Sequence, residues 1–153
     1  MMHLEKQTLR TWFGCLLGPN MYHIAYASRA IGYISSVDLA ELCHSSAAHN
    51  QLVGVTGLLV FDGVRYIQLI EGEASAVCLL MARIARDSRH DKIVYIIDGP
   101  TPQRAFENWD LACIGFKANL SGPQLLADVK TKVRNVTDIH IQASFIGFAA
   151  LAN

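Results

Sequence analysis

Three uncharged polar residues, Tyr26, Asn50 and Gln68, stand in segments of the chain that are otherwise apolar. Gln68 lies between Ile67 and Leu69, and a buried amide that lacks hydrogen-bond partners costs roughly 1–3 kcal/mol. An amide offers two donors and one acceptor, so it suits the polar edge of a heteroaromatic ligand. A glutamine that faces solvent, or that is satisfied within the protein, is the alternative interpretation.

A second group of polar residues is charged and follows the next amphipathic segment: Arg83, Arg86, Asp87, Arg89 and His90. Cations near the C-terminus of a helix are stabilised by the helix dipole, which is the structural interpretation. The functional interpretation is a cradle for a ligand that carries phosphate, because guanidinium groups bind phosphate well.

Motifs of the common enzyme classes are missing from the sequence. It contains no G-x-S-x-G, no H-E-x-x-H, no Walker loop and no G-x-G-x-x-G. Its six histidines form no pair at i, i+4 that encloses a carboxylate, so we expect no metal site. The polar residues above therefore favour ligand binding over catalysis.

The elements that must position these residues follow from hydrophobic periodicity and turn signals. We predict a strand at 21–27, a helix from Ser35 or Ser36 to about Asn50, strands at 53–61 and 64–70, a helix at 74–86, and strands at 92–97 and 109–116. Asp62-Gly63 is a strong hairpin signal between the second and third strands. The order βαββαββ predicts a ferredoxin-like α+β fold, with a mixed, antiparallel-rich sheet and two helices on one face.

The two ends of the chain lie outside this pattern. Residues 1–20 are expected to be an N-terminal extension, either an unstructured or non-native lead or a helix over the sheet. Residues 21–117 form the predicted domain. Residues 118–153 are expected to be helical, with Pro123 opening one helix and a stripe of Ile141, Phe145 and Phe148 covering the open sheet face or a second subunit.

Composition limits the classes of function. Hydrophobic residues make up 52% of the 153 residues and charged residues 17%, which excludes a disordered chain. Thirteen Lys and Arg balance thirteen Asp and Glu, so the basic excess of a nucleic-acid binder is missing. We expect the apolar surplus to face a ligand or another protein chain, and we expect a homo-oligomer.

Cysteine spacing and the lack of a long apolar run bear on the compartment. Cys15, Cys43, Cys78 and Cys113 form no C-x-x-C pair, and we expect free thiols in a reducing compartment. No run approaches the roughly 20 apolar residues that span a bilayer. A cytoplasmic protein without membrane contact is therefore expected.

Five segments of the chain, taken in order, resemble the BLUF domain, the family of blue-light sensors that use FAD. The resemblance extends from about residue 21 to residue 116. The segments are IAYASRA at 24–30, AHNQLVGVTGLL at 48–59, YIQLIEG at 66–72, IARDSRH at 84–90 and RAFENWDL at 104–111. They resemble, respectively, the family patterns Y-x-S-x-A, N-x-x-x-G-I-T-G-x-L, F-x-Q-x-L-E-G, I-x-x-D-x-R-H and R-x-F-x-x-W-x-M.

The resemblance assigns roles to matched positions. Tyr26 and Gln68 resemble the photoactive pair beside the flavin, and Trp109 resembles an indole near Gln68. Asn50 resembles the residue that holds the polar edge of the flavin ring. The remaining expected cofactor-binding residues are His49, Arg83, Asp87, Arg89 and His90. The implied cofactor is FAD, with FMN or riboflavin as alternatives, and the ring is expected between the two helices.

One position departs from the family pattern. Leu111 stands where the family often has Met two residues after the tryptophan, and leucine cannot accept a hydrogen bond. The implied mechanism depends on other residues: Tyr26 gives an electron and a proton to the photochemistry, and the amide of Gln68 rotates or tautomerises. No covalent bond to the flavin is needed.

The resemblance thus implies a blue-light photoreceptor that is not an enzyme and that signals to a separate protein or through its oligomeric state. Two alternatives remain from the residues themselves. One is a ferredoxin-like ligand-binding or regulatory module that does not sense light. The other is a small hydrolase of the acylphosphatase type, for which Arg29 would have to bind an anion, although its loop is not glycine-rich.

Overall fold

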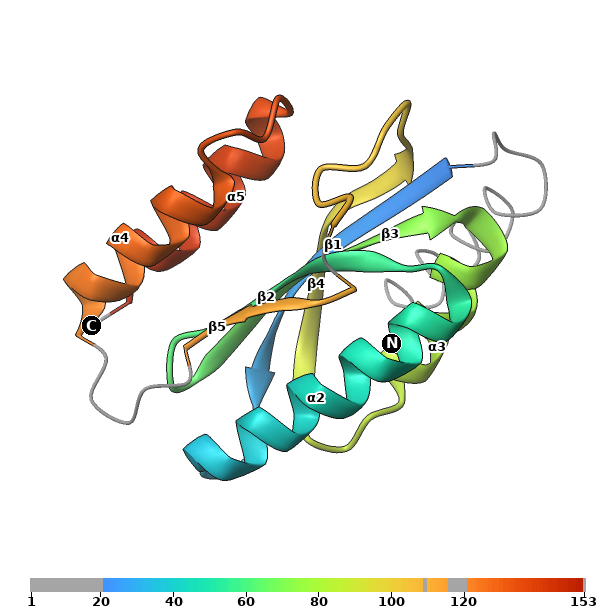
Figure 1. Ribbon diagram of the computed structural model, residues 1–153. Helices are drawn as coiled ribbons and strands as arrows, with labels where there is room; N and C mark the ends of the chain where they lie inside the picture. The colour runs from blue at the N-terminus through green and yellow to red at the C-terminus, as the bar shows by residue number, and fades with distance from the viewer. Residues whose placement is uncertain (1–20, 109, 116–120, 153) are drawn as a thin grey trace.

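A five-stranded sheet with helices on both of its faces forms the fold (Figure 1). The computed structural model describes residues 21–108, 110–115 and 121–152. Within them the chain forms β1 (Met21–Ala30), α2 (Ser36–Val53), β2 (Thr56–Phe61), β3 (Arg65–Glu73), α3 (Ala74–Ala85), β4 (His90–Pro100), β5 (Ala112–Ile114), α4 (Gly122–Val133) and α5 (Ile139–Ala150). The predicted order βαββαββ and the α+β class are confirmed.

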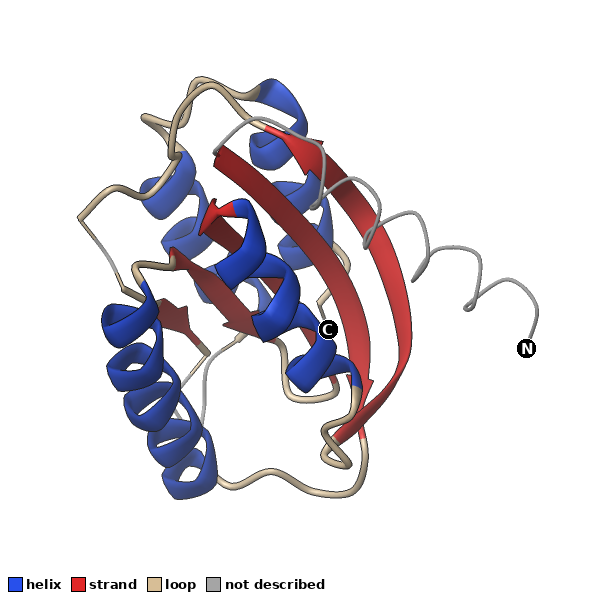
Figure 2. Cartoon of the chain, turned by 90° about the vertical axis from the view of Figure 1, so that its right-hand side faces the viewer, coloured by secondary structure: helices blue, strands red, loops and turns tan. Residues whose placement is uncertain are grey.

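The strand order in the sheet is β4-β1-β3-β2-β5. Strand β1 pairs with β3 and β4 in antiparallel fashion, and β2 pairs with β3 in the same way. Only the β2–β5 pair is parallel among the described strands. The sheet is therefore mixed and antiparallel-rich, as the sequence predicted, and its long strands curve strongly (Figure 2).

Helix α2 begins at a capping box. The hydroxyl of Ser35 accepts from the backbone N–H of Asp38, and the Asp38 carboxylate accepts from the backbone N–H of Ser35. The helix ends at Gly54, whose φ of 69° places it in the left-handed region that favours glycine. The predicted strand at 53–61 is therefore wrong at its start, because the helix continues to Val53 before this cap.

Four other predicted strands differ from the structure in their boundaries. Strand β1 continues to Ala30, past its predicted end at residue 27, because β3 and β4 both pair with this part of it. Strand β3 continues past residue 70 to Glu73, and β4 extends from His90 to Pro100, because both strands pair with β1 along this length. The predicted strand at 109–116 is reduced to Ala112–Ile114, where it pairs with β2. Residues 109 and 116 lie outside the described residues.

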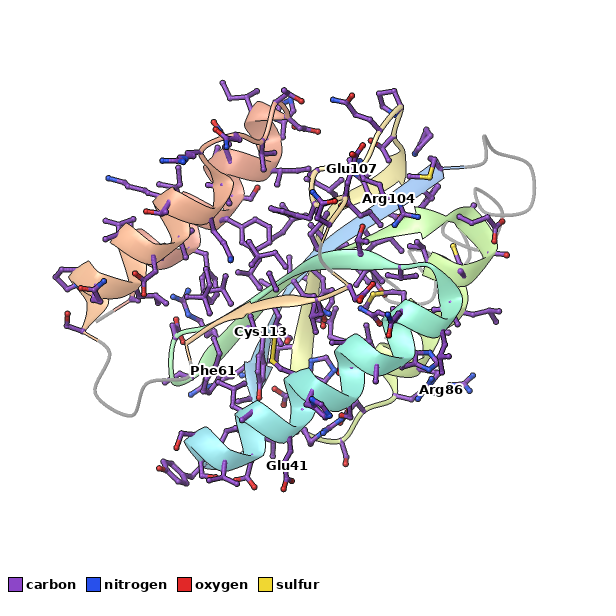
Figure 3. All side chains as sticks on the ribbon, in the orientation of Figure 1. Glu41, Phe61, Arg86, Arg104, Glu107 and Cys113 are labelled. Atoms are coloured by element: carbon purple, nitrogen blue, oxygen red, sulfur yellow. A yellow bond between two sulfur atoms is a disulfide. The ribbon has the colours of Figure 1, made fainter. Side chains whose placement is uncertain are left out.

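The two faces of the sheet carry different helices. Alternate residues of β3 divide between them: Gln68 and Ile70 face α2 and α3, whereas Ile67 and Leu69 face α4 and α5. The two helices predicted for one face are thus on one face, and the apolar C-terminal stripe covers the opposite face of the chain's own sheet. Figure 3 shows the side chains that fill this second layer.

No helix among the described residues is both long and apolar enough to cross a membrane.

Candidate flavin-type cavity between α2 and α3

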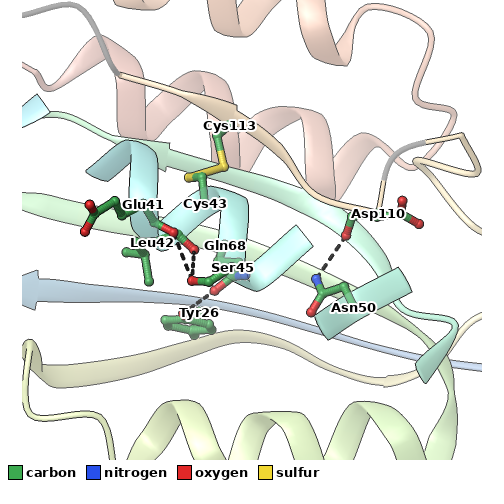
Figure 4. The surroundings of a disulfide bond; sticks show 9 residues. All are labelled: Tyr26, Glu41, Leu42, Cys43, Ser45, Asn50, Gln68, Asp110 and Cys113. Carbon is green, nitrogen blue, oxygen red and sulfur yellow. Dashed lines mark hydrogen bonds between the residues drawn. A yellow bond between two sulfur atoms is a disulfide. The ribbon is translucent and has the colours of Figure 1, made fainter. Parts of the chain in front are cut away.

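Sheet register places the first two candidate residues opposite each other. In the antiparallel β1–β3 pair, Tyr26 faces Gln68, and both are buried, with 3% and 7% of their surface exposed. The hydroxyl of Tyr26 donates a hydrogen bond to Oε1 of Gln68 (Figure 4). Directly opposed residues on one sheet face are close neighbours, so this contact follows from register alone.

The phenol of Tyr26 is held in its protonated form. Burial is the main cause that raises its pKa above the ordinary value of 10.0, and the negative charge of Asp87 acts in the same direction. The group therefore keeps its proton in the resting protein and presents it to a neutral amide oxygen.

Asn50 links the end of α2 to the segment that precedes β5. It is 1% exposed, and its Nδ2 donates to the backbone carbonyl of Asp110 at 2.9 Å (Figure 4). The side chain therefore holds a part of the chain 60 residues away in sequence against the helix that lines the cavity.

His49 and Arg83 join the two helices at the mouth of the cavity. Nη1 of Arg83 lies 2.8 Å from Nε2 of His49. A guanidinium has no acceptor, so Arg83 can only be the donor in this contact. The contact brings α2 and α3 together across the space between them.

Asp87, Arg89 and His90 follow α3. Nε of Arg89 donates to Oδ1 of Asp87 at 2.9 Å, and this pairing lowers the pKa of Asp87 to about 2. His90 lies deeper: its Nε2 is 2.7 Å from the carbonyl oxygen of Ile84, and its Nδ1 is 2.8 Å from Oγ of Ser28. Nε2 must donate, because a carbonyl oxygen only accepts.

A single cavity of about 240 Å³ connects these residues. All eight predicted binding positions within the described residues line it: Tyr26, His49, Asn50, Gln68, Arg83, Asp87, Arg89 and His90. Trp109, the ninth predicted site residue, lies outside the described residues. The structure thus brings together groups that are spread over more than 60 positions of sequence, although their contacts with a ligand remain predictions.

Sequence analysis missed seven further lining residues: Leu42, Ser45, Ser46, Leu59, Tyr66, Leu80 and Ile84. Helical spacing could have found five of them, since Leu42, Ser45 and Ser46 share a face with His49, and Leu80 and Ile84 share a face with Arg83 and Asp87. Leu59 is opposite Gln68 in the β2–β3 pair, and Tyr66 is two residues before Gln68 on the same face.

The expectation of free thiols is wrong for all three described cysteines, Cys43, Cys78 and Cys113, which are disulfide-bonded. Cys43 and Cys113 form a disulfide with a Cα–Cα distance of 6.6 Å between α2 and β5 (Figures 3 and 4). The sequence could not show this pair, because 70 positions separate them and only the parallel β2–β5 pairing brings β5 beneath α2.

Leu111, the departure noted in the sequence, packs against the apolar cluster next to this disulfide. The cluster contains Leu39, Cys43, Leu59, Phe61 and Tyr66. Leu111 is half-buried there. It packs there without lining the cavity, and a leucine side chain offers no hydrogen-bond acceptor.

A family model matches the chain over residues 21–112, more than half of its length. The model is that of BLUF, the sensors of blue light using FAD. The match begins at the first residue of β1 and ends at the first residue of β5.

Two relatives with curated names share part of this region. The photoactivated adenylate cyclase subunit alpha of Euglena gracilis is 30% identical over 73 residues, which are 48% of this chain and 7% of the relative. The blue light- and temperature-regulated antirepressor BluF of Escherichia coli K12 is 32% identical over 68 residues, which are 44% of this chain and 17% of that protein. The chain thus corresponds to a small part of each.

Solved structures resemble the chain over nearly its whole described length. The dark-state structure of BlrB, a BLUF protein, has a TM-score of 0.62 at 26% identity, and the match covers 82% of this chain and 97% of BlrB. The BLUF structure of BlrP1 has a TM-score of 0.70 at 23% identity, covering 88% of this chain and 90% of that one. At that identity the second likeness supports the fold alone.

Proposed function

The chain belongs to the BLUF family, the sensors of blue light using FAD, and on that premise we propose that its light response passes through Tyr26 and Gln68 in the cavity between α2 and α3. Membership makes the chain a blue-light photoreceptor with FAD as its cofactor. The hydrogen bond between the buried Tyr26 hydroxyl and Gln68 Oε1 is the observation that carries the proposal.

The cavity residues fit a flavin. The side chains of Leu42, Leu59, Leu80 and Ile84 supply apolar walls, which suit a flat aromatic ring system. The amides of Asn50 and Gln68 supply donors and acceptors for its polar edge. Arg83 and Arg89, from α3 and the turn that follows it, add cations suited to the phosphate-bearing part of FAD.

Flavin, when bound, supplies the absorption of blue light and an acceptor for one electron. Tyr26 gives up that electron, and its phenolic proton moves along the existing hydrogen bond to Gln68. The Gln68 side chain is nearly symmetric in shape but not in hydrogen bonding, so its rotation or tautomerisation reverses donor and acceptor positions with little movement.

The change at Gln68 has a path out of the cavity. Gln68 lies in β3, next to β2, and β2 pairs with β5. The Cys43–Cys113 disulfide and the contact between Asn50 and Asp110 both fasten the β5 segment to α2. We propose that this segment, which follows Trp109 in the sequence, carries the signal towards a protein partner or an oligomer interface.

The chain's own part in signalling is proposed to be non-catalytic, in a cytoplasmic protein that acts through another protein. The cyclase and antirepressor relatives suggest outputs of that kind, in fused or separate effectors. A homo-oligomer is proposed as well, and size-exclusion chromatography in the dark and under blue light tests it. A change in elution volume on illumination would identify the oligomer as the output.

An absorption spectrum of the purified protein in the dark and after blue illumination tests the central proposal. Wild type should be yellow, with a small red shift of the flavin bands in the light. Tyr26→Phe and Gln68→Leu should bind flavin and lose the shift. Tyr33→Phe, at an exposed position outside the cavity, is the control and should keep it. A shift that survives in both cavity variants would show that the response uses other residues.

A further inference from the structure

A second tyrosine lines the same cavity. Tyr66 lies two residues before Gln68 in β3, so both side chains point to the same face of the sheet. Tyr66 is 5% exposed. It stands where the F-x-Q-x-L-E-G pattern carries Phe, and so it adds an oxidisable phenol to a position that the pattern fills with an inert ring.

The hydroxyl of Tyr66 has no hydrogen-bond partner among the described residues, and it is buried. Phe61 stacks on one side of the ring, with 4.6 Å between centroids, and offers no acceptor. His90 stands edge-on at 6.4 Å, but both of its nitrogens are already bonded, to Ser28 and Ile84. Among the described residues, no side chain or backbone group is therefore placed to accept the proton of the Tyr66 hydroxyl.

Charged neighbours do not alter this conclusion. Arg89 carries no acceptor, and the Asp87 carboxylate is bonded to the Arg89 side chain and backbone. Burial raises the pKa of Tyr66, while the Arg89 charge opposes that effect. Tyr26 differs from Tyr66 in having an acceptor for its proton, because the hydroxyl of Tyr26 already donates to Gln68.

We propose that Tyr66 is a second electron donor to photoexcited flavin and that it competes with Tyr26 without producing the lit state. The inference rests on the proposed function of this cavity. One electron leaves the Tyr66 ring and the same electron returns, while the proton stays on the Tyr66 oxygen. No bond forms or breaks and nothing is consumed. Each photon that takes this route is lost to signalling.

Removal of the Tyr66 hydroxyl should therefore improve the photoreceptor. Phenylalanine keeps the ring that stacks on Phe61, and it removes only a hydroxyl that lacks a partner, so folding should be preserved. Phenylalanine cannot supply the electron. In Tyr66→Phe we expect a higher quantum yield of the red-shifted state, compared at equal FAD loading.

Fluorescence lifetimes of bound FAD in four chains test the proposal: wild type, Tyr66→Phe, Tyr26→Phe, and the Tyr26→Phe/Tyr66→Phe double variant. Trp109 is common to all four, so its contribution cancels in the comparison. Tyr95→Phe is the matched control, because Tyr95 lies across from Tyr26 in β4 but does not line the cavity. FAD titration and circular dichroism establish equal loading and folding.

The double variant should have a severalfold longer lifetime than Tyr26→Phe, whereas Tyr26→Phe/Tyr95→Phe should match Tyr26→Phe. Equal lifetimes with and without the Tyr66 hydroxyl would overturn the proposal, as would a lower quantum yield in Tyr66→Phe. Failure of the proposed function is a separate result: wild type would then show no red shift, while the lifetime comparison would still decide the role of Tyr66.

Discussion

At the scale of single residues, the cavity is defined by which polar groups have partners. Tyr26 has Gln68, Asn50 has the Asp110 carbonyl, and the hydroxyl of Tyr66 has none among the described residues. Two tyrosines that line one cavity are therefore chemically distinct, because only the hydroxyl of Tyr26 donates a hydrogen bond to another described residue. The sequence alone lists both as tyrosines in strands.

Glu71 shows a different use of a buried polar group at the end of β3. It is fully buried, and its carboxylate accepts from the backbone N–H groups of Ala105 at 2.8 Å and Phe106 at 2.7 Å. Arg104 donates to the Glu71 carbonyl and to Thr56. These contacts fasten the segment between β4 and β5 to the strand that carries Gln68.

We expect Glu71 to make the stability of the protein depend on pH. Burial raises the pKa of Glu71 above 4.5 in the folded state, so the folded chain binds this proton more tightly than the unfolded chain does. The resulting stabilisation is complete below pH 4.5 and is lost as the pH rises through the raised pKa. Urea unfolding of wild type and Glu71→Gln from pH 4 to pH 7 measures it.

The free energy of unfolding of wild type, relative to Glu71→Gln, should therefore fall as the pH rises across that range. Glu107→Gln, at an exposed position on the same loop, is the control and should follow wild type at every pH. A difference between wild type and Glu71→Gln that stays constant or grows with pH would contradict the assignment.

At the scale of elements, the short strand β5 depends on its attachments. It has three residues, pairs only with β2 among the described strands, and is joined to α2 by the Cys43–Cys113 disulfide. Gly115 follows it with a φ of 116°, and a Cβ there would lie 2.2 Å from the carbonyl oxygen of Phe61. Both features hold the end of the sheet in one position.

Loss of the disulfide should destabilise the protein. In the chain-entropy model, a cross-link across 70 positions contributes about 4 kcal/mol by restricting the unfolded chain. Cys43→Ser should lower the free energy of unfolding by up to about that amount in chemical denaturation without reductant. Faster amide exchange in Ala112–Ile114 should accompany the loss, because β5 would keep only the β2 pairing.

The partner substitution supplies the control for this experiment. Cys113→Ser should cost about as much as Cys43→Ser, and the double variant should cost little more than either, because all three chains lack the same bond. Losses that add fully in the double variant, or two single variants as stable as wild type, would mean that the cross-link does not stabilise this protein.

At the scale of the whole molecule, the sheet separates two cores with different tasks. One face, with α2 and α3, holds the cavity and its polar groups. The other face is an apolar layer closed by α4 and α5, in which Val129, Val133 and Phe145 are fully buried. Polar chemistry is thus confined to one side of the sheet, and the second layer stabilises the sheet from behind.

Phe145 tests this division. Truncation of a fully buried phenylalanine costs about 3–5 kcal/mol, so Phe145→Ala should lower the free energy of unfolding by that amount. Flavin affinity at a temperature where the variant is folded should change little, because Phe145 packs on the face opposite the cavity. Chemical denaturation and FAD titration measure the two quantities.

Ile139→Ala is the matched control, since Ile139 begins the same helix but is 70% exposed. Its cost should stay within about 0.5 kcal/mol. If Phe145→Ala weakened flavin binding as strongly as it weakened folding, the two layers would not be separable as described.

Sequence by itself determined the α+β class, the order of the elements and eight of the fifteen described residues that line the cavity. It could do so because these depend on local signals: periodicity for the helices and strands, Asp62-Gly63 for the hairpin, Ser35 for the start of α2, and motif residues at fixed spacing. The sequence did not predict that α2 continues to Val53 or that β5 is so short, because a glycine cap ends the helix and a short parallel pairing limits the strand.

Only the tertiary structure decided which distant groups meet. Three contacts join residues that lie 34 or more positions apart in the sequence. They are the Cys43–Cys113 disulfide, the hydrogen bond from Asn50 to Asp110, and the hydrogen bond that the Glu71 carboxylate accepts from Ala105. The lack of a partner for the Tyr66 hydroxyl among the residues that the structure describes belongs to the same class, since it depends on what surrounds the group in space. Such pairings are set by sheet register and helix packing, and the spacing of residues along the chain does not record them.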